Sequence, residues 1–284
     1  MKQQSDHFPV LGIQDFSDNL NSAGELLFNE LHGERSIDLP HRHDFFIINI
    51  FKEGKGTHII DFVPYPIHHH HVHLVFPDQV HQWSIGKGTV GYQLMVSRSW
   101  FKNLLSSLRF SALFYQSHPV IDLPEDAFQS VFQEFKYIQK EMAAQNIFWE
   151  IVQKRCEIIG LMISRAVEES FIGYEAKNAH PVLSKFLNLI DLNFNEERSV
   201  AFYADRLHIS ANYLNIISKK NLNTSASSLI QNRILLEAKR LLKVSEKSVK
   251  DIVYDLGFYD HASFSKFFKS NTGMTPTQFR EKLF

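Results

Sequence analysis

The strongest constraint on the fold of this 284-residue chain is a series of helix-boundary signals in its last third. Ser and Thr are preferred at helix starts because their side-chain oxygen accepts a backbone N–H that has no partner within the helix. Gly257 and Gly273 stand where helices should end. We therefore predict seven helices between Pro181 and Phe284, the longest from about Ser225 to Lys243. The expected helix starts are Ser199, Ser210, Ser248 and Thr275, the last two with Asp251 and Gln278 at the capping-box distance.

Two pairs of short helices are expected, one on each side of the long helix. In the first pair, Ala204 is small enough for two helices to cross closely, and Leu214 and Ile217 would point into the core. In the second pair, "VKDIVYDLGF" precedes "DHASFSKFFKS", with Phe264, Phe267 and Phe268 expected to be buried. Each pair has the pattern of a helix–turn–helix, whose second helix fits the major groove of DNA. One pair alone is equally typical of a small helical domain, but two pairs at a fixed offset favour DNA binding.

The distribution of charge agrees with a nucleic-acid partner for this segment. Pro181–Phe284 contains 15 Lys and Arg against 10 Asp and Glu, a net charge of +5. Met1–His180 contains 15 against 21, a net charge of −6. A basic segment on an acidic body is typical of proteins that bind nucleic acid through one part of the chain.

Composition also bears on the compartment. The single cysteine, Cys156, indicates a reducing environment. No apolar run approaches the ~18 residues that a membrane helix needs. We therefore expect a cytoplasmic protein that has no membrane partner.

The outward positions of the two second helices are the candidates for DNA contacts. Asn can pair with adenine through two hydrogen bonds, and Lys can reach guanine or a phosphate. Lys220 and Lys269 stand at the ends of their helices, where contact with the DNA backbone is the natural role. The candidates for base contacts are Asn212, Asn215 and Lys219 in the first unit, and His261, Ala262, Ser263, Ser265 and Lys266 in the second.

The stretch "SVKDIVYDLGFYDHASFSKFFKSNTGMTPTQFR" (Ser248–Arg280) resembles the signature of AraC/XylS-type transcriptional regulators. Upstream, "RILLEAKRLL" (Arg233–Leu242) resembles the linker helix of that family. The resemblance implies that the two units bind successive major grooves on one face of DNA. It assigns base contacts to Asn212, Asn215 and Ile216 in the first unit, and to His261, Ala262, Ser263 and Lys266 in the second.

Four positions depart from the family pattern. Val253 replaces a usual alanine, and Ser218 stands where phenylalanine is common. Asn223 replaces the glycine that usually ends the helix, but Asn tolerates the left-handed conformation better than other non-glycine residues. Ile216 cannot form a hydrogen bond with a base.

The sequence pattern up to about Pro124 is typical of β-structure. Gly, Pro and Asp residues separate short apolar runs such as "DFFIINIF" (Asp44–Phe51), "GTHIIDFV" (Gly56–Val63) and "VHLVF" (Val72–Phe76). Regular short strands with such turns predict a sandwich or a barrel.

Between Pro124 and Glu169 the pattern changes to two amphipathic helices. They have more apolar positions than one stripe facing the β-domain would use, including Phe128, Phe135, Phe148 and Trp149. We predict that these helices pair two chains in a homodimer. "FIGYEAKNAHP" (Phe171–Pro181) is expected to be a linker.

Members of this family often carry an N-terminal cupin-like β-barrel that senses a small molecule, and "HRHDFFIINIFKEGKGTHIIDF" with the later "FPDQVHQW" resembles such a domain. His41 and His43 match the His-x-His of cupin enzymes, and His81 matches the later histidine. The glutamate of cupin metal sites is missing, because Phe46, Ile47 and Ile48 stand in its place. Three histidines can hold Zn²⁺ or Fe²⁺ without it. We assign these histidines to an effector pocket and predict no metal and no cofactor.

The run His68–His71 is a separate feature. On a strand, alternate residues share a face, so His69, His71 and His73 would lie in a row with neighbours ~6.5 Å apart. Two such residues can share a metal, but three in a row cannot easily converge on one. We interpret the run as structural or solvent-facing.

The sequence thus predicts an α+β multidomain protein. Its parts are a cupin-like sensor domain (1–124), a helical dimerisation segment and linker (125–180), and an all-α double helix–turn–helix domain (181–284). The predicted function is sequence-specific DNA binding and control of transcription in response to an effector. The predicted partners are double-stranded DNA, a small-molecule effector, a second copy of the chain and RNA polymerase.

Two other classes of function remain open. The first is a metal-dependent cupin enzyme fused to a DNA-binding tail, although no phosphate-binding glycine loop and no nucleophile–base pair is recognisable, and we predict no enzymatic activity. The second is an interaction protein whose helix–turn–helix units bind protein partners. Metal content and salt-dependent DNA affinity would distinguish them.

Overall fold

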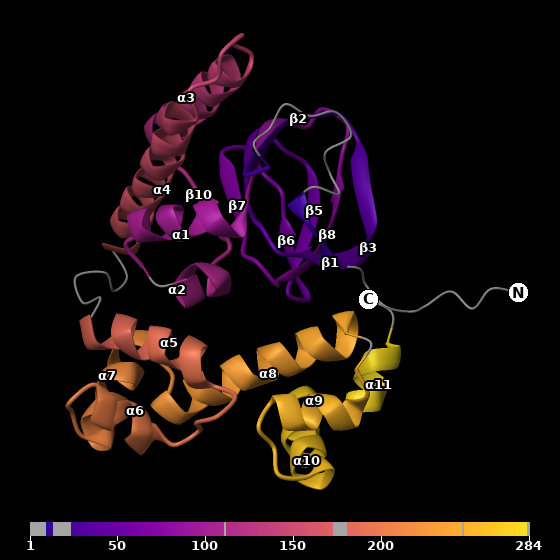
Figure 1. Ribbon diagram of the computed structural model, residues 1–284, viewed down its shortest axis with the longest axis vertical. Coiled ribbons are helices and arrows are strands. Elements are labelled where there is room, and N and C mark those ends of the chain that lie inside the picture. The colour runs from indigo at the N-terminus through magenta and orange to yellow at the C-terminus, as the bar shows by residue number, and fades with distance from the viewer. Residues whose placement is uncertain (1–9, 14–23, 111, 173–180, 246, 283–284) are drawn as a thin grey trace, which may run out of the picture. The chain divides into compact units, whose positions relative to one another are not determined.

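The computed structural model describes residues 10–13, 24–110, 112–172, 181–245 and 247–282 (Figure 1). The chain divides into two compact units, an N-terminal one within residues 9–174 and a C-terminal one within residues 175–284. The domain boundaries expected at 124 and 180 stay predictions. Residues 173–180 of the expected linker lie outside the described residues.

The N-terminal unit contains two five-stranded sheets. One sheet has the order β1 (Val10–Leu11), β3 (Arg35–His43), β8 (Val80–Ile85), β5 (Gly56–Ile60) and β6 (Val63–Pro66). The other has the order β10 (Val120–Asp122), β7 (His71–Val75), β4 (Phe46–Glu53), β9 (Val90–Val96) and β2 (Leu26–His32). All pairs are antiparallel except β1 with β3.

The expected cupin-like β-domain is confirmed, but within the described residues its strands do not close into one barrel. The two sheets face each other, because Ile47 and Val75 from one sheet share an apolar cluster with Ile60 from the other. Alternate residues of β4 point to opposite faces of the sheet, and Phe46, Ile48 and Ile50 therefore lie in a second core outside the sandwich. Burial on both faces explains the continuous apolar run of this strand.

The structure differs from the all-β expectation between Val96 and Pro124. Helix α1 (Arg98–Ser107) begins after Ser97, whose hydroxyl accepts a hydrogen bond from the backbone N–H of Trp100 at 3.3 Å. Helix α2 (Ala112–Ser117) follows. The strand expected over Gly56–Val63 is also shorter, since β5 ends at Ile60 before a turn into β6.

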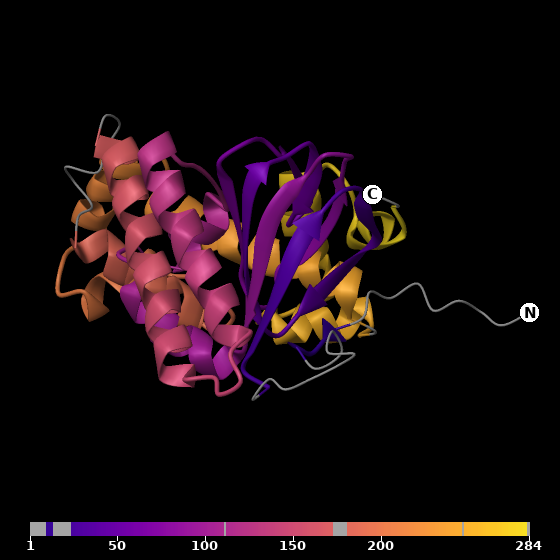
Figure 2. The same ribbon diagram turned by 90° about the horizontal axis from the view of Figure 1, so that it is seen from above.

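Helices α3 (Glu125–Met142) and α4 (Trp149–Ile172) cover the second sheet (Figure 2). Phe128 and Phe135 are fully buried in the core that these helices share with the sheet, and Trp149 is partly buried against it. Phe128 and Phe135 therefore stabilise the fold of their own chain, and the expectation that they pair two chains is wrong for these two residues. Phe148, in contrast, is 62% exposed.

The C-terminal unit consists, in its described residues, of the seven helices that the capping signals predict. They are α5 (Pro181–Asn193), α6 (Val200–Arg206), α7 (Ala211–Leu222), α8 (Ala226–Val244), α9 (Val249–Asp255), α10 (His261–Thr272) and α11 (Pro276–Glu281). Ser199, Ser210, Ser248 and Thr275 each cap a helix, and the last two form the predicted capping boxes. Across the residues described, no helix is both long and apolar enough to span a membrane.

Candidate functional site

The first helix–turn–helix consists of α6 and α7. Ala204 is 1% exposed, and its carbonyl accepts a hydrogen bond from Ile209 N at 3.0 Å across the turn. Leu214 and Ile217 are buried as predicted. Helix α7 ends at Asn223, whose φ of 52° is left-handed, so asparagine does replace the usual glycine at this position.

The solvent-facing side of α7 carries most of the predicted DNA contacts. Asn212, Ile216, Lys219 and Lys220 are exposed. Asn215 is an exception, because it is half-buried and its Oδ1 accepts a hydrogen bond from Ala226 N at 3.0 Å. Since a two-bond contact with adenine uses both the oxygen and the nitrogen of an Asn side chain, Asn215 serves first to join α7 to α8. Sequence analysis missed the neighbouring Tyr213, which is also exposed.

The second helix–turn–helix consists of α9 and α10. Phe264 and Phe268 are fully buried and Phe267 is half-buried, in agreement with the predicted core face. Asp260 caps α10 through a hydrogen bond from Ser263 N to its Oδ1 at 2.7 Å, and the Ser263 hydroxyl donates to its Oδ2 at 2.9 Å. The predicted contact residues His261, Ala262, Ser263 and Lys266 are exposed, and Ser265 is half-buried with its hydroxyl 3.3 Å from Nδ1 of His261.

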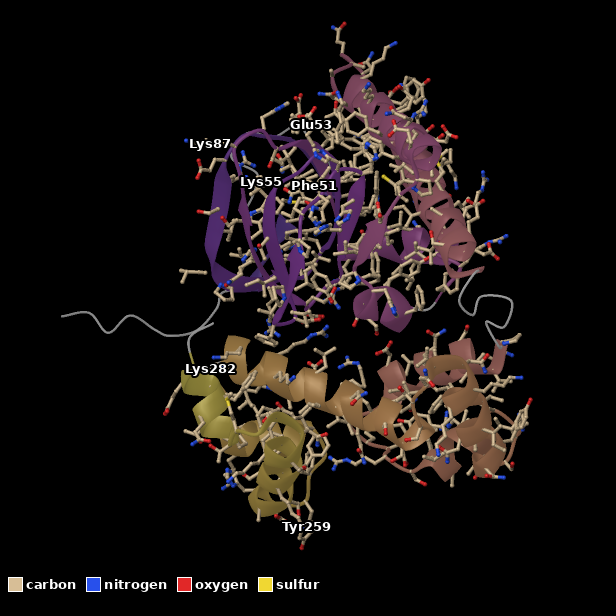
Figure 3. The ribbon with its side chains drawn as sticks, turned by 180° about the vertical axis from the view of Figure 1, so that it is seen from behind. Phe51, Glu53, Lys55, Lys87, Tyr259 and Lys282 are labelled. Atoms are coloured by element: carbon tan, nitrogen blue, oxygen red, sulfur yellow. The ribbon has the colours of Figure 1, made fainter. Side chains whose placement is uncertain are left out.

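Sequence analysis also missed Tyr259, which is 93% exposed in the turn before α10 and projects from the unit in Figure 3. A residue of a turn has no periodicity that would mark it as buried or exposed, so only the structure identifies it.

Four exposed lysines, Lys219 and Lys220 on α7 and Lys266 and Lys269 on α10, form no ion pair within the described part of the chain. Lys219, Lys220 and Lys269 lie in the last turns of their helices. Their charge is therefore available to an external anion such as a DNA phosphate.

Direct contacts connect the two helix–turn–helix units. The Arg198 guanidinium lies 3.6 Å from the centre of the Phe258 ring, and its Nη2 donates to the carbonyl of Leu256 at 2.7 Å. Gly257 has a φ of +68°, and a Cβ at this position would lie 1.9 Å from the carbonyl oxygen of Asn195. The segment before α6 is thus packed onto the turn between α9 and α10 of the second helix–turn–helix. Together with α8, this contact fixes the orientation of one second helix relative to the other.

In the N-terminal unit, the structure brings the predicted histidines together and adds two more. Nε2 of His43 lies 3.0 Å from Nε2 of His81, and Nδ1 of His81 lies 2.9 Å from Nε2 of His58. Nδ1 of His58 lies 3.1 Å from Nδ1 of His73 on the opposite sheet. His43, His81, His58 and His73, which we name the histidine chain, are therefore linked by hydrogen bonds between the sheets. His41 lies beside His81, with ring centres 4.4 Å apart and the ring planes tilted by 47°.

The register of the second sheet extends this polar layer. Asn29 lies opposite Gln93, Gln93 opposite Asn49, and Asn49 opposite His73 on successive strands. The Gln93 amide donates to Asn49 Oδ1 at 3.0 Å, and the Asn29 amide donates to Gln93 Oε1 at 3.2 Å. Along β4, Asn49 lies between the apolar Ile47 and Phe51. We name this layer, the three amides, the histidine chain and His41, the polar belt.

Burial decides the charge of the polar belt. The pKa of His43 and that of His58 are lowered to about 3 because burial disfavours the charged form. Burial also lowers the pKa of His73 and His81 well below the ordinary value, and that of His41 to a smaller degree. The histidines of the polar belt are therefore uncharged at neutral pH.

Both ring nitrogens of His43 and of His81 are engaged. His43 Nδ1 lies 2.7 Å from the carbonyl oxygen of Phe45, and the remaining nitrogens belong to the histidine chain. A ligand or a metal could bind to them directly only by breaking these hydrogen bonds. In the ranges described, no group of three or more His, Cys, Asp or Glu side chains has the arrangement of a metal site.

The histidine run is not one strand face. β7 begins at His71, whereas His69 is exposed in the preceding turn. The expectation that His69, His71 and His73 share one face of a strand is therefore wrong. His73 does face the interior, and its alternation with Val72 and Leu74 was visible in the sequence. His58 and Asn49 were missed, because alternation shows which residues share a face but not which strands lie opposite each other.

Comparison with known proteins gives two family matches. Residues 26–145 match the model described as AraC-like ligand binding domain, and residues 203–282 match the model described as Helix-turn-helix domain. The polar belt and α3 lie in the first range, and most of both helix–turn–helix units in the second.

Several known proteins are similar to this chain. The HTH-type transcriptional activator RhaS of Escherichia fergusonii is 25% identical over 246 residues, which cover 85% of this chain and 87% of that protein. RhaS of Citrobacter koseri is 24% identical over 253 residues, which cover 85% and 87%. Among solved structures, a transcriptional regulator of Chromobacterium violaceum with an AraC-type DNA-binding domain is 26% identical with a TM-score of 0.34, covering 37% of this chain and 93% of that one.

The buried histidines predict a steep loss of stability in acid. The folded state keeps His43, His58, His73 and His81 neutral, whereas the unfolded chain protonates them below a pH of about 6.5. The unfolded state then binds more protons, so stability is fully present above that pH. Below it, stability falls by up to about 1.4 kcal/mol per pH unit for each histidine. Urea unfolding of the N-terminal unit across this range measures the slope.

His58→Phe should reduce the slope by about one proton, whereas His69→Phe, at an exposed turn position, should leave it unchanged. A free energy of unfolding that stays constant from neutral pH to about two units below the histidine pKa would contradict the neutral interior.

Proposed function

Since this chain is an AraC-type transcriptional regulator with a ligand-binding domain before a helix–turn–helix domain, we propose that its polar belt binds the effector and that α7 and α10 read the DNA sequence. The proposal that α7 and α10 read DNA rests on one observation. Arg198 and Asn195 contact the turn of the second helix–turn–helix. Two helices held at a fixed orientation can enter two major grooves at a fixed spacing.

The exposed side chains suggest a division of roles along α7 and α10. Asn212 and His261, near the N-terminal ends of their helices, have hydrogen-bonding groups suited to base edges. Ile216 offers only apolar contact, for example with a thymine methyl group. Lys219, Lys220 and Lys269 are suited to phosphates, and Lys266 to a base edge.

The first prediction concerns salt. Three lysines that each neutralise one phosphate (Lys219, Lys220 and Lys269) give a slope of about −2.7 in a plot of log affinity against log salt, which is roughly a 40-fold loss over a fourfold rise in salt. Fluorescence anisotropy of the isolated segment 181–284 with duplex DNA measures it. Lys269→Ala should weaken binding to all sequences and reduce the slope by about one, whereas Lys266→Ala should relax preference at one base position.

Lys185→Ala, on the exposed side of α5 and outside both helix–turn–helix units, is the matched control and should have no effect on the slope. An affinity that does not change with salt would count against DNA binding through these helices, and would favour a protein partner for the units.

We propose that the effector binds at the polar belt between the two sheets. An uncharged polar layer between two apolar clusters is the composition expected of a small-molecule pocket. His41, His43 and His81 remain the proposed ligand-binding residues. Because the nitrogens of His43 and His81 are already paired, these two act by orienting the belt.

The second prediction follows from this orienting role. His43→Ala removes the ring that joins the histidine chain to the Phe45 carbonyl, and it should abolish the effector response in a reporter assay. Effector-free DNA binding should persist, since the DNA-reading helices belong to the other unit. His69→Ala is the matched control. Normal regulation by a variant with alanine at His41, His43 and His81 would show that these histidines are structural.

We propose a homodimer formed through the exposed side of α4. Ile151, Ile158 and Leu161 recur at helical spacing and are 41%, 38% and 48% exposed, and Phe148 precedes them. A dimer would place two DNA-reading units on one operator. RNA polymerase is a further proposed partner, because the similar RhaS proteins are named transcriptional activators.

The third prediction tests this surface. The full chain should sediment as a dimer at micromolar concentration, and Ile158→Glu with Leu161→Glu should shift it to a monomer without unfolding it. Leu192→Glu, at an exposed leucine of α5, is the matched control and should stay dimeric. A wild-type chain that is strictly monomeric would refute the proposed dimer.

A further inference from the structure

The two helix–turn–helix units repeat one pattern of helix boundaries. Helix α7 begins after Ser210 and ends at the left-handed Asn223, and α10 begins after Asp260 and ends at the left-handed Gly273. The helices that follow them, α8 and α11, also begin after a capping hydroxyl. All of these boundaries in the second unit follow those in the first at one constant offset in the sequence. Every position of α7 therefore has a counterpart on α10.

The offset pairs Ile216 of α7 with Lys266 of α10. On each helix this position lies midway between two buried residues four positions apart, which are Leu214 and Ser218 on α7 and Phe264 and Phe268 on α10. Since a helix turns by about 100° per residue, the residue midway between them lies on the opposite face. In agreement, Ile216 is 52% exposed and Lys266 is exposed. The two side chains thus occupy equivalent places on the two faces that are proposed to enter DNA.

The surroundings of Ile216 on α7 are largely apolar. Residues three positions apart are neighbours on a helix surface, so Tyr213 flanks Ile216, and Tyr213 is 42% exposed. The adjacent Asn215 already uses its Oδ1 to accept the hydrogen bond from Ala226 N at 3.0 Å. The basic residues of α7 lie in its last turn. The middle of the exposed face of α7 therefore presents an aliphatic side chain beside an aromatic ring.

Lys266 has different surroundings on α10. The exposed residues one turn earlier, Ala262 and Ser263, are small. The Ser263 hydroxyl donates to Asp260 Oδ2 at 2.9 Å and is thus engaged in the helix cap. Lys266 is therefore the long polar side chain at the middle of the exposed face of α10. Its ammonium group has three N–H donors and no acceptor.

The major groove of DNA presents groups that suit these two side chains differently. The C5-methyl of thymine is an apolar group, whereas guanine presents two acceptors, N7 and O6. An isoleucine that covers a polar group of a base leaves that group without a hydrogen bond, so Ile216 favours the thymine methyl. A lysine can only donate, so Lys266 favours the acceptors of guanine over the amino group of adenine or cytosine.

We propose that Ile216 and Lys266 are specificity-determining residues that make the two half-sites of one chain different in base. Ile216, with Tyr213 beside it, selects thymine through its methyl group, and Lys266 selects guanine at the equivalent position of the other half-site. This inference rests on the proposed entry of α7 and α10 into DNA and specifies the bases that they read. The site of one chain is therefore not a repeat of one sequence, and the chain binds it in one orientation.

Selection of binding sites from random-sequence duplex DNA by the full-length protein tests the difference between the half-sites. The selected site should require thymine in one half and guanine in the other, with the two halves about one helical turn apart. Ile216→Lys should change the selected thymine to guanine and leave the other half unchanged. Selection of the same base at the equivalent position of both halves by the wild-type protein would overturn the inference.

A substitution in the DNA tests the methyl contact without any change to the protein. Deoxyuridine in place of the selected thymine removes only the methyl group, and it should weaken wild-type binding about fourfold, as expected for one buried group of this size. Ile216→Ala should bind both duplexes equally, whereas Lys266→Met, the matched control, should keep the wild-type difference. Equal affinity of the wild-type protein for both duplexes would show that Ile216 does not read the methyl group.

The complementary substitution is 7-deazaguanine, which lacks the N7 acceptor. In place of the selected guanine it should weaken wild-type binding about fivefold. Lys266→Met should be insensitive to it, and Ile216→Ala should show the full effect. A site that is bound in a salt-dependent manner but is insensitive to both base substitutions would overturn only the assignment of bases. The absence of salt-dependent DNA binding would overturn the proposed function as well.

Discussion

The hydrogen bond between His58 and His73 joins the two sheets at the centre of the N-terminal unit, and much of the structure depends on it. A buried imidazole is stable only when it is uncharged and its nitrogens have partners. By placing one histidine beside the next, from His73 to the carbonyl of Phe45, the strands give a partner to every ring nitrogen of the histidine chain except Nε2 of His73. The cross-strand register also matters, because Asn49 lies opposite His73 only in the observed alignment of β4 with β7.

The same sheet connects the sensor to its helices. β4 has Asn49 on its inner face and Ile48 and Ile50 on its outer face, where they share a core with α3 and α4. A shift of β4 would thus displace residues of both the polar belt and the helical layer, since close-packed cores transmit displacement. The exposed Ile158 and Leu161 lie on the far side of this layer. This packing offers a physical route from the proposed effector site to the proposed dimer surface.

The C-terminal unit depends on rigid coupling. Asn215 ties α7 to α8, and Arg198 ties the segment before α6 to the turn before α10. If α7 and α10 bind two grooves together, as proposed, helices held in this way lose little orientational entropy, which favours a bipartite site over two separate ones. The left-handed Gly257 makes the same contact possible, because only glycine leaves room for the Asn195 carbonyl beside the turn before α10.

The sequence by itself determined the helical unit almost completely. Its caps at Ser199, Ser210, Ser248 and Thr275, its stops at Asn223 and Gly273, and its buried Phe264 and Phe268 are local or periodic signals, which depend on neighbours within one or two turns. The family pattern and the surface lysines follow from the same stretch. The hydrogen bond of Asn215 to α8 could not be predicted in this way, since the pattern of exposed positions on a helix gives no sign of a bond to the next helix.

Only the tertiary structure decided what the histidines do. Alternation along β7 and β8 places His73 and His81 on an inner face, but it does not say that they meet through His58. It also could not show that Phe128 and Phe135 are buried within their own chain while Ile158 and Leu161 remain exposed. In each case the answer depends on which strand or helix lies opposite, and that pairing is set by contacts between residues far apart in the chain.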